Sequence, residues 1–316
     1  MIGSIVIFIS GVVILNICTR FLISGSKSIA YRLNVPKIFG LLLIVAISVS
    51  IPEFAVSMNA MARGNVDLVL GVIFGSCFIN SLLILGVSSF NKPLCVKNNT
   101  INKELPLYLL CTGVLFVLFH DIEISKASFN QITRNDGVVI VLFFFIFLYY
   151  LISYTSKNSD IKNKKPKYSL GISIVLIIIG LAGIVLGSEY IVSNSIILTE
   201  LLGMSEKLFA MTFVSFAVSI PEVVSCVKLF NKGEQDYLIG NMITSNIFNI
   251  CIALGIPILI YGSIATTSFS IYDFISLMCS GLVLFVVAKT NNTITKKQGL
   301  MMILIFIIYY LWLFLK

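Results

Sequence analysis

Charged residues are scarce in this sequence: Asp, Glu, Lys and Arg make up 11% of its 316 residues, whereas 58% are hydrophobic. Such a chain carries more apolar surface than a water-soluble domain can bury. The composition therefore excludes an ordinary soluble protein and predicts that lipid is the solvent.

Histidine and organised cysteine are also lacking. There is one His, and the seven Cys are scattered, mostly inside apolar segments, without C-x-x-C spacing. The sequence offers no His base, no activated nucleophile and no phosphate-binding glycine loop, so we predict that it is not an enzyme and has no cofactor. The same scarcity argues against a dedicated Zn²⁺ or Cu⁺ site.

The formal net charge of +8 comes from basic residues in short segments between apolar runs. Because they do not form one basic face, we expect no nucleic-acid partner and interpret them as topology signals. Apolar stretches long enough for a membrane of ~30 Å predict an all-α membrane protein of ten helices. The segments are 3–24, 37–62, 67–90, 105–120, 136–155, 169–192, 206–230, 236–262, 270–289 and 298–315.

The most hydrophilic segment, at 156–168, divides the chain into two groups of five helices, 1–155 and 169–316. Sixteen Lys and Arg residues fall in the loops on one side of the predicted membrane and five on the other. The positive-inside rule then places the linker in the cytoplasm and both termini outside. The first apolar run has no basic segment before it and no A-x-A-like site after it, so we expect a retained helix.

An internal repeat appears when the chain is shifted by 169 residues. Twelve of the 41 pairs from Ala46 to Gly86 are then identical, and the segment Ser50 to Glu53 aligns with Ser219 to Glu222. The repeats cover about 40–86 and 209–255. Because each half has an odd number of helices, the two halves are predicted to be inverted, a topology typical of secondary transporters.

Each repeat places a Pro and a Glu inside an apolar helix. Pro52 and Pro221 are expected to break or kink their helices and to border a cavity at membrane depth. Glu53 and Glu222 have no Lys or Arg in these central segments to pair with. A mobile cation is therefore expected to compensate their charge.

Oxygen-bearing side chains surround the two Glu residues in the sequence. Ser76 and Asn80 are four residues apart on the next predicted helix and share a face, and Ser245 and Asn249 repeat the spacing. Carboxylate, amide and carbonyl oxygens are the ligands that Ca²⁺ prefers. Na⁺ could use subsets of them, although hydrogen bonds between helices are an alternative role for these Ser and Asn side chains.

These segments resemble the alpha repeats of the cation/calcium exchanger superfamily, particularly prokaryotic sodium/calcium exchangers. The resemblance is sharpest in Ala46 to Glu53, Gly71 to Asn80, Ser219 to Glu222 and Gly240 to Asn249. It implies that Glu53 and Glu222 bind Ca²⁺ and that Asn80 and Asn249 line the central site. It further implies oxygen ligands for Na⁺ or Ca²⁺ at Ser50, Ser219, Ser76 and Ser245, and main-chain carbonyls at Ala46 and Ser215.

The chain departs from this family pattern at several positions. Val49 and Val218 stand where the family usually has a hydroxyl side chain, and Val72 and Cys77 stand where it usually has Asn. Asn249 stands where some relatives carry Asp, which leaves two formal carboxylates in the predicted cavity. Sodium coupling is therefore less firmly implied than calcium binding.

The function predicted from these features is Ca²⁺/Na⁺ antiport by alternating access in a prokaryotic cell membrane, with helices one and six moving. An H⁺-coupled exchanger of Ca²⁺ or another divalent cation is an alternative. A membrane scaffold or sensor that binds an ion without transporting it is another. The sequence assigns no role to Arg20, Glu189 or His120, which are expected at the membrane interfaces.

Overall fold

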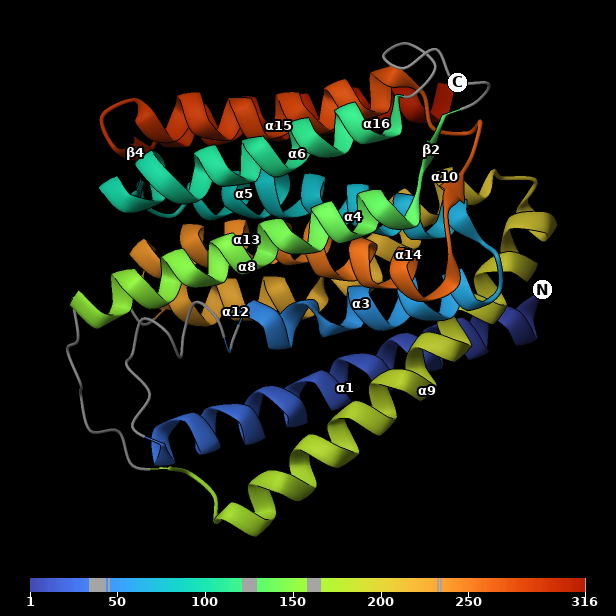
Figure 1. The fold of residues 1–316 in the computed structure, drawn as a ribbon, viewed down its shortest axis with the longest axis horizontal. Coiled ribbons are helices and arrows are strands. Elements are labelled where there is room, and N and C mark those ends of the chain that lie inside the picture. The colour runs from blue at the N-terminus through green and yellow to red at the C-terminus, as the bar shows by residue number, and fades with distance from the viewer. Residues whose placement is uncertain are drawn as a thin grey trace.

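The computed structural model describes residues 1–33, 44, 46–120, 130–157, 166–231, 233 and 235–315. Helices dominate this part of the chain (Figure 1). The first half contains α1 (Ile2–Arg32), α3 (Ala46–Ala62), α4 (Val66–Phe78), η2 (Ile79–Ile84), α5 (Leu85–Ser88), η3 (Thr100–Glu104), α6 (Leu105–Phe119) and α8 (Arg134–Lys157). The elements labelled η are π-helical segments that continue directly into their α-helical neighbours.

The second half repeats much of this order. It contains α9 (Leu170–Leu202), α10 (Glu206–Phe209), η4 (Ala210–Val214), α11 (Ser215–Val218), α12 (Ile220–Asn231), α13 (Gln235–Phe248), η5 (Asn249–Leu254), α14 (Gly255–Tyr261), α15 (Ile271–Lys289) and α16 (Lys296–Leu315). A π-helical segment therefore follows α4 in one half and α13 in the other. The two sit at nearly matching positions of the sequence repeat.

Eight helices among the described residues are long and apolar enough to cross a membrane, and the bent pair formed by Glu206–Val218 and Ile220–Asn231 makes a ninth. These lengths and the many exposed Ile, Leu, Val and Phe side chains confirm a multi-pass, all-α membrane protein. The predicted span at 37–62 falls partly outside the described residues. Its described part, α3, has 17 residues, and the count of ten helices stays a prediction.

Helix α9 is longer than the predicted span of 169–192. It runs for 33 residues because the polar side chains near its end bond within the helix: Asn194 donates to the carbonyl of Tyr190, and Ser195 to that of Ile191. The helix ends at Gly203, whose φ of 64° suits a left-handed cap. Polar residues after position 192 were thus a poor signal for the end of this helix.

Helices α1 and α9 lie side by side along one face of the molecule (Figure 1). Glycines make this packing close: a Cβ at Gly183 would lie 2.9 Å from the Cβ of Cys18, and one at Gly187 would lie 2.8 Å from the Cβ of Leu15. Such small-residue contacts let helix backbones approach in a membrane. The two helices thus form one tightly packed pair.

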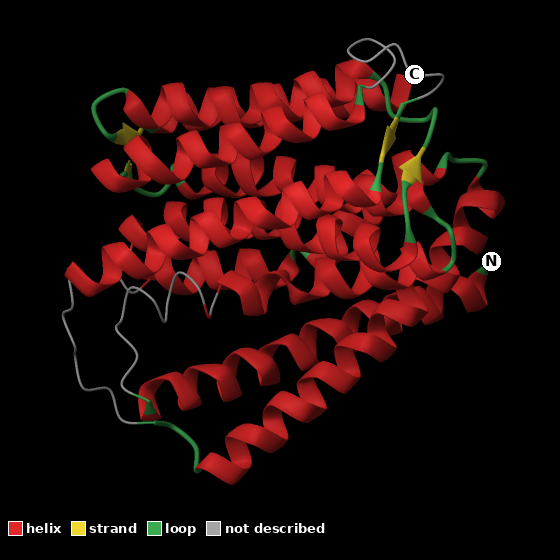
Figure 2. Cartoon of the chain, in the orientation of Figure 1, coloured by secondary structure: helices red, strands yellow, loops and turns green. Residues whose placement is uncertain are grey.

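The interior is built from the α4–η2–α5 and α13–η5–α14 segments, which are the most buried of the spans. Helix α3 packs against both α4 and η5. Two short strand pairs join the halves: β1 (Leu94–Cys95) with β4 (Thr293–Ile294), and β2 (Gln131–Ile132) with β3 (Ile264–Ala265). Figure 2 shows the two pairs at opposite ends of the bundle.

The two helices that carry the repeated Pro-Glu pair differ. Helix α3 passes through Pro52 without interruption, so the predicted break is not found there; loss of a single N–H donor is accommodated inside the packed helix. In the second half the helix does break, at Ser219, where φ is −80° and ψ is 1°, and its two parts are bent by 43°. Pro221 lies just after this break.

Candidate functional site

Glu53 of α3 and Glu222 of α12 meet in the interior. Both side chains are fully buried, with 0% exposure, and their carboxyl groups lie close enough to interact. Neither forms an ion pair within the described part of the chain. Two carboxyl groups from the two halves of the sequence therefore share one buried place.

Hydrogen bonds between the halves surround this pair. Ser50 Oγ donates to Glu222 Oε1 at 3.4 Å, and Ser219 Oγ donates to Ser76 Oγ at 3.2 Å. Ser76 in turn lies within reach of Glu53. Four Ser and two Asn side chains were predicted around the carboxylates. The structure brings three of them, Ser50, Ser76 and Ser219, next to the two Glu residues.

Glycine packing places Ser76 at this point. A Cβ at Gly75 would lie 2.6 Å from the Cβ of Ser215, so α4 runs almost in contact with α11. Gly71, one turn earlier, approaches Ala210 equally closely. These two glycines let α4 pack against the second half so that Ser76 meets Ser219.

The two Asn residues of the predicted site have different surroundings. Asn80 Nδ2 donates to Asn246 Oδ1 at 3.1 Å, and Asn246 Nδ2 donates to Ser81 Oγ at 2.8 Å. Asn80 Oδ1 is buried without a hydrogen-bond partner. Asn249 Oδ1 and Nδ2 are also buried, and neither has a partner. Asn80 is thus oriented by a neighbour, whereas Asn249 is not.

Several oxygen atoms of the predicted site residues are buried without a hydrogen-bond partner. Both carboxyl oxygens of Glu53, Glu222 Oε2, Asn80 Oδ1 and Ser245 Oγ are buried and accept or donate no hydrogen bond. Buried polar atoms are normally paired, and buried carboxylates need compensation. The set fits a hard cation such as Ca²⁺ or Na⁺, which takes carboxylate, amide and hydroxyl oxygens.

The remaining predicted residues are buried in the same helices. Ala46 is 0% exposed at the start of α3. Ser215 is equally buried; its hydroxyl bonds to the carbonyl of Met211, and its own carbonyl accepts the N–H of Ser219 at 3.0 Å. That carbonyl is thus already part of the helix just before the break.

Some buried polar residues were not among the predicted site residues. Asn246 is the partner of Asn80, and Ser57, Asn241 and Thr244 are buried without hydrogen-bond partners. Ser57 lies one turn after Glu53, and Asn241 one turn before Ser245. Extending the i, i+4 spacing in both directions could have found these two from the sequence.

The departures from the family pattern are also buried. Val49, Val218, Val72 and Cys77 are all 0% exposed. No cluster of three or more His, Cys, Asp or Glu side chains that could hold a metal occurs in the described residues. The two carboxylates therefore depend on neutral oxygens to complete any coordination shell.

A multi-pass helical bundle with ionisable side chains buried in its interior is typical of membrane transport proteins. The sequence model of the sodium/calcium exchanger protein family matches residues 3–153 and 172–315. This chain belongs to that family. The family consists of exchangers, which agrees with the expectation that the protein is not an enzyme.

Relatives and solved structures match this chain along nearly its full length. The chain is 30% identical to uncharacterized membrane protein MJ0091 of Methanocaldococcus jannaschii, with 95% of each chain covered. It is 26% identical to sodium/calcium exchanger MaX1 of Methanosarcina acetivorans, covering 98% of this chain and 97% of that one. A structure of the sodium-calcium exchanger NCX_Mj soaked with Na⁺ and Sr²⁺ matches with a TM-score of 0.69 and 28% identity, covering 97% of each chain.

Proposed function

We propose that this protein exchanges Ca²⁺ for Na⁺ across the membrane, with Glu53 and Glu222 as shared cation ligands. The observation that carries the proposal is the meeting of these two buried carboxyl groups without a cationic side chain paired to either among the described residues. Two carboxylates balance the charge of one Ca²⁺. They also supply separate places for Na⁺.

The other proposed ligands are oxygens from both repeats. Ser50, Ser219, Ser76 and Ser245 supply hydroxyls, Asn80 and Asn249 supply amide oxygens, and Ala46 and Ser215 supply main-chain carbonyls. The hydrogen bonds from Ser50 to Glu222 and from Ser219 to Ser76 support this assignment, because they join both halves at one place. Ca²⁺ and Na⁺ would compete for these shared oxygen ligands, and this competition is the basis of exchange.

Alternating access follows from an inverted arrangement of two five-helix halves, 1–155 and 169–316, joined by the 156–168 linker. The twelve identities of the repeat, the matched π-helical segments and the two strand pairs support this arrangement. The closely packed α1–α9 pair is the element that would move over the rest. The N and C termini lie at the same end of the bundle, which agrees with both being outside (Figure 1).

Proton coupling is the second candidate, and two buried residues favour it. Val49 and Val218 bring no side-chain oxygen beside Ser50 and Ser219, which reduces the ligands available to Na⁺. Glu53 and Glu222 could instead each take a proton as Ca²⁺ leaves.

The test is Ca²⁺ uptake into Na⁺-loaded proteoliposomes, with and without an outward Na⁺ gradient and with a pH gradient in Na⁺-free vesicles. Na⁺-driven uptake that is abolished by Glu53→Gln and by Glu222→Gln would support the proposal. Uptake driven only by the pH gradient would favour proton coupling. No flux under any gradient, with Ca²⁺ binding retained, would overturn both and leave an ion-binding scaffold.

A further inference from the structure

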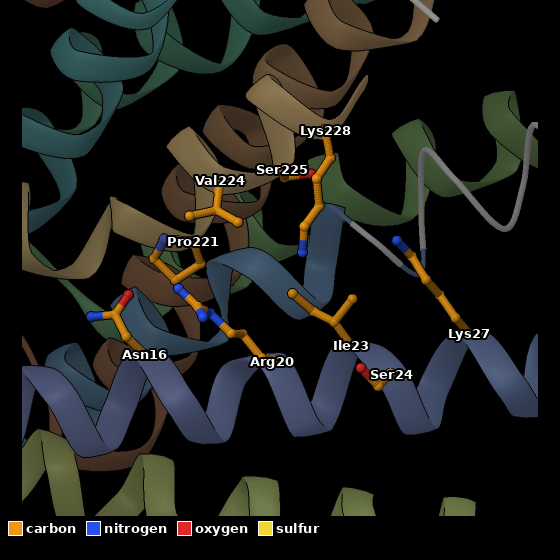
Figure 3. Close-up of a pocket in the computed structure, with 9 residues that line it drawn as sticks. All are labelled: Asn16, Arg20, Ile23, Ser24, Lys27, Pro221, Val224, Ser225 and Lys228. Carbon is orange, nitrogen blue, oxygen red and sulfur yellow. The ribbon is translucent and has the colours of Figure 1, made fainter. Parts of the chain in front are cut away.

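A pocket of about 60 Å³ lies between α1 and α12, outside the buried carboxylate site (Figure 3). Its lining includes three cationic side chains, Arg20, Lys27 and Lys228, and no acidic one. Figure 3 shows Arg20 and Lys27 projecting from α1 and Lys228 reaching toward α1 from the opposite helix. Basic side chains from two helices thus converge on one small space.

Two of these cations have no charged partner. Arg20 and Lys228 form no hydrogen bond or ion pair with the described residues, and both are exposed residues that line the pocket. Like charges that face one small space repel each other, and the repulsion is strongest where membrane limits the access of water. An anion between them would remove this repulsion.

The geometry of the lining favours a phosphate group. An Arg guanidinium presents a planar fork of donors that matches phosphate oxygens, and Lys supplies additional point charges. Ser225 adds a hydroxyl to the lining. One water needs ~10–15 Å³ of cavity volume. The pocket of about 60 Å³ therefore has room for a few waters or one phosphate-sized group.

We propose that this pocket binds a phosphate-bearing anion, either the headgroup of an anionic phospholipid or a soluble phosphate. The basic linker and loops predict that this end of α1 faces the cytoplasm, where anionic lipids attract Lys and Arg. Pro221 lines the pocket and immediately precedes Glu222. A bound anion would therefore join α1 to the helix that carries a proposed cation ligand.

A consequence for transport rests on the proposed function. An anion held by Arg20 and Lys228 ties α1 to α12 and lowers the positive potential near Glu222. Both effects would change the rate at which α1 moves and the ease with which a cation reaches the site from this side. Binding itself is measured without Ca²⁺ or flux, so failure of the antiport proposal and failure of this one are distinguishable.

The experiment uses the full chain purified in detergent and compares wild type with the double variant Arg20→Gln/Lys228→Gln. The matched control is Lys92→Gln/Lys297→Gln, which removes the same charge from exposed positions outside the pocket. Native mass spectrometry counts retained phosphatidylglycerol against phosphatidylcholine of the same acyl chains. A lipid-free arm measures thermal protection by inorganic phosphate at constant ionic strength.

We expect wild type and control to retain phosphatidylglycerol, and the pocket variant to lose about tenfold in affinity, because charge-assisted hydrogen bonds are removed. Protection by phosphate alone, lost in the pocket variant, would identify a soluble anion as the ligand. Equal binding of both probes by the pocket variant and the control would overturn the proposal. If the double variant does not fold, Arg20→Lys and Lys228→Gln singly replace it, and an unchanged affinity in both would overturn the proposal equally.

Discussion

Asn80 on one half of the bundle donates a hydrogen bond from Nδ2 to Oδ1 of Asn246 on the other half, at 3.1 Å. Asn246 is itself held by its bond to Ser81 at 2.8 Å. These two hydrogen bonds orient the amide of Asn80 and leave its Oδ1 without a partner, as the proposed role of Asn80 as a cation ligand requires. At the repeat position of Asn246 the first half has Cys77, which cannot orient Asn249 in the same way.

Asn246→Ala is expected to weaken Ca²⁺ binding by about tenfold, because a buried amide N–H of Asn80 loses its acceptor and the carbonyl oxygen is no longer held in place. Isothermal titration with Ca²⁺ measures the change. Cys251→Ala is the control, since Cys251 is buried in the adjacent η5 segment and its thiol contacts that of Cys111 at 3.7 Å. A folded Asn246→Ala variant with wild-type affinity would contradict the positioning role.

Asn249→Asp is expected to bind Ca²⁺ more tightly than wild type, by about tenfold or more. A third carboxylate within several ångströms of a divalent ion adds Coulomb attraction of a few kcal/mol even at an effective dielectric of ~20. Asn249→Ala should move the affinity in the opposite direction. Titration of both variants checks the order, and weaker binding by Asn249→Asp than by wild type would exclude Asn249 from the cation site.

Much of the candidate site could be proposed from the sequence because its signals are local. Proline, Glu, Ser and Asn repeat at fixed spacing on apolar helices, and an apolar environment makes each of them conspicuous. The meeting of Ser50 with Glu222, by contrast, depends on how α3 packs against α12, which a single sequence does not encode locally. The same holds for Asn246, whose importance lies in its partner on another helix.

The ends and breaks of helices were predicted less well. Pro52 and Pro221 have the same sequence context, yet α3 continues through one while the chain bends at Ser219 before the other. Tertiary packing therefore decides whether proline breaks a helix here. Arg20 was placed near a helix end, but α1 continues to Arg32 and carries it into the pocket lining.

The buried ion pair of Lys207 and Asp273 should matter more for stability than the exposed pair of Arg63 and Glu189. Lys207 Nζ lies 2.7 Å from Asp273 Oδ2, and Tyr309 donates to the other carboxyl oxygen at 3.2 Å. Asp273→Asn removes the carboxylate that pairs with this buried ammonium, so we expect a loss of ~3–5 kcal/mol in unfolding free energy.

The comparison for that prediction is Arg63→Gln. Both partners of the exposed pair are more than one third accessible, with 37% and 39% exposure, and such pairs contribute ~0–1 kcal/mol. Thermal unfolding of both variants in the same detergent measures the difference. Equal shifts in melting temperature would show that burial of the Lys207–Asp273 pair does not carry the stability assigned to it.

Movement of α1 over the second half can be tested where the two are joined. Asn16 Nδ2 of α1 donates to the carbonyl of Ala217 at 3.3 Å, just before the break at Ser219. We expect that oxidation of the double variant Asn16→Cys/Ala217→Cys forms a disulfide that stops Na⁺-driven Ca²⁺ uptake and that reduction restores it. Ca²⁺ binding should persist in the oxidised form, because the bond holds the helices without touching the carboxylates. Uptake at the rate of the reduced protein, with the cross-link shown by mass spectrometry to be complete, would mean that α1 does not move against α11 during transport.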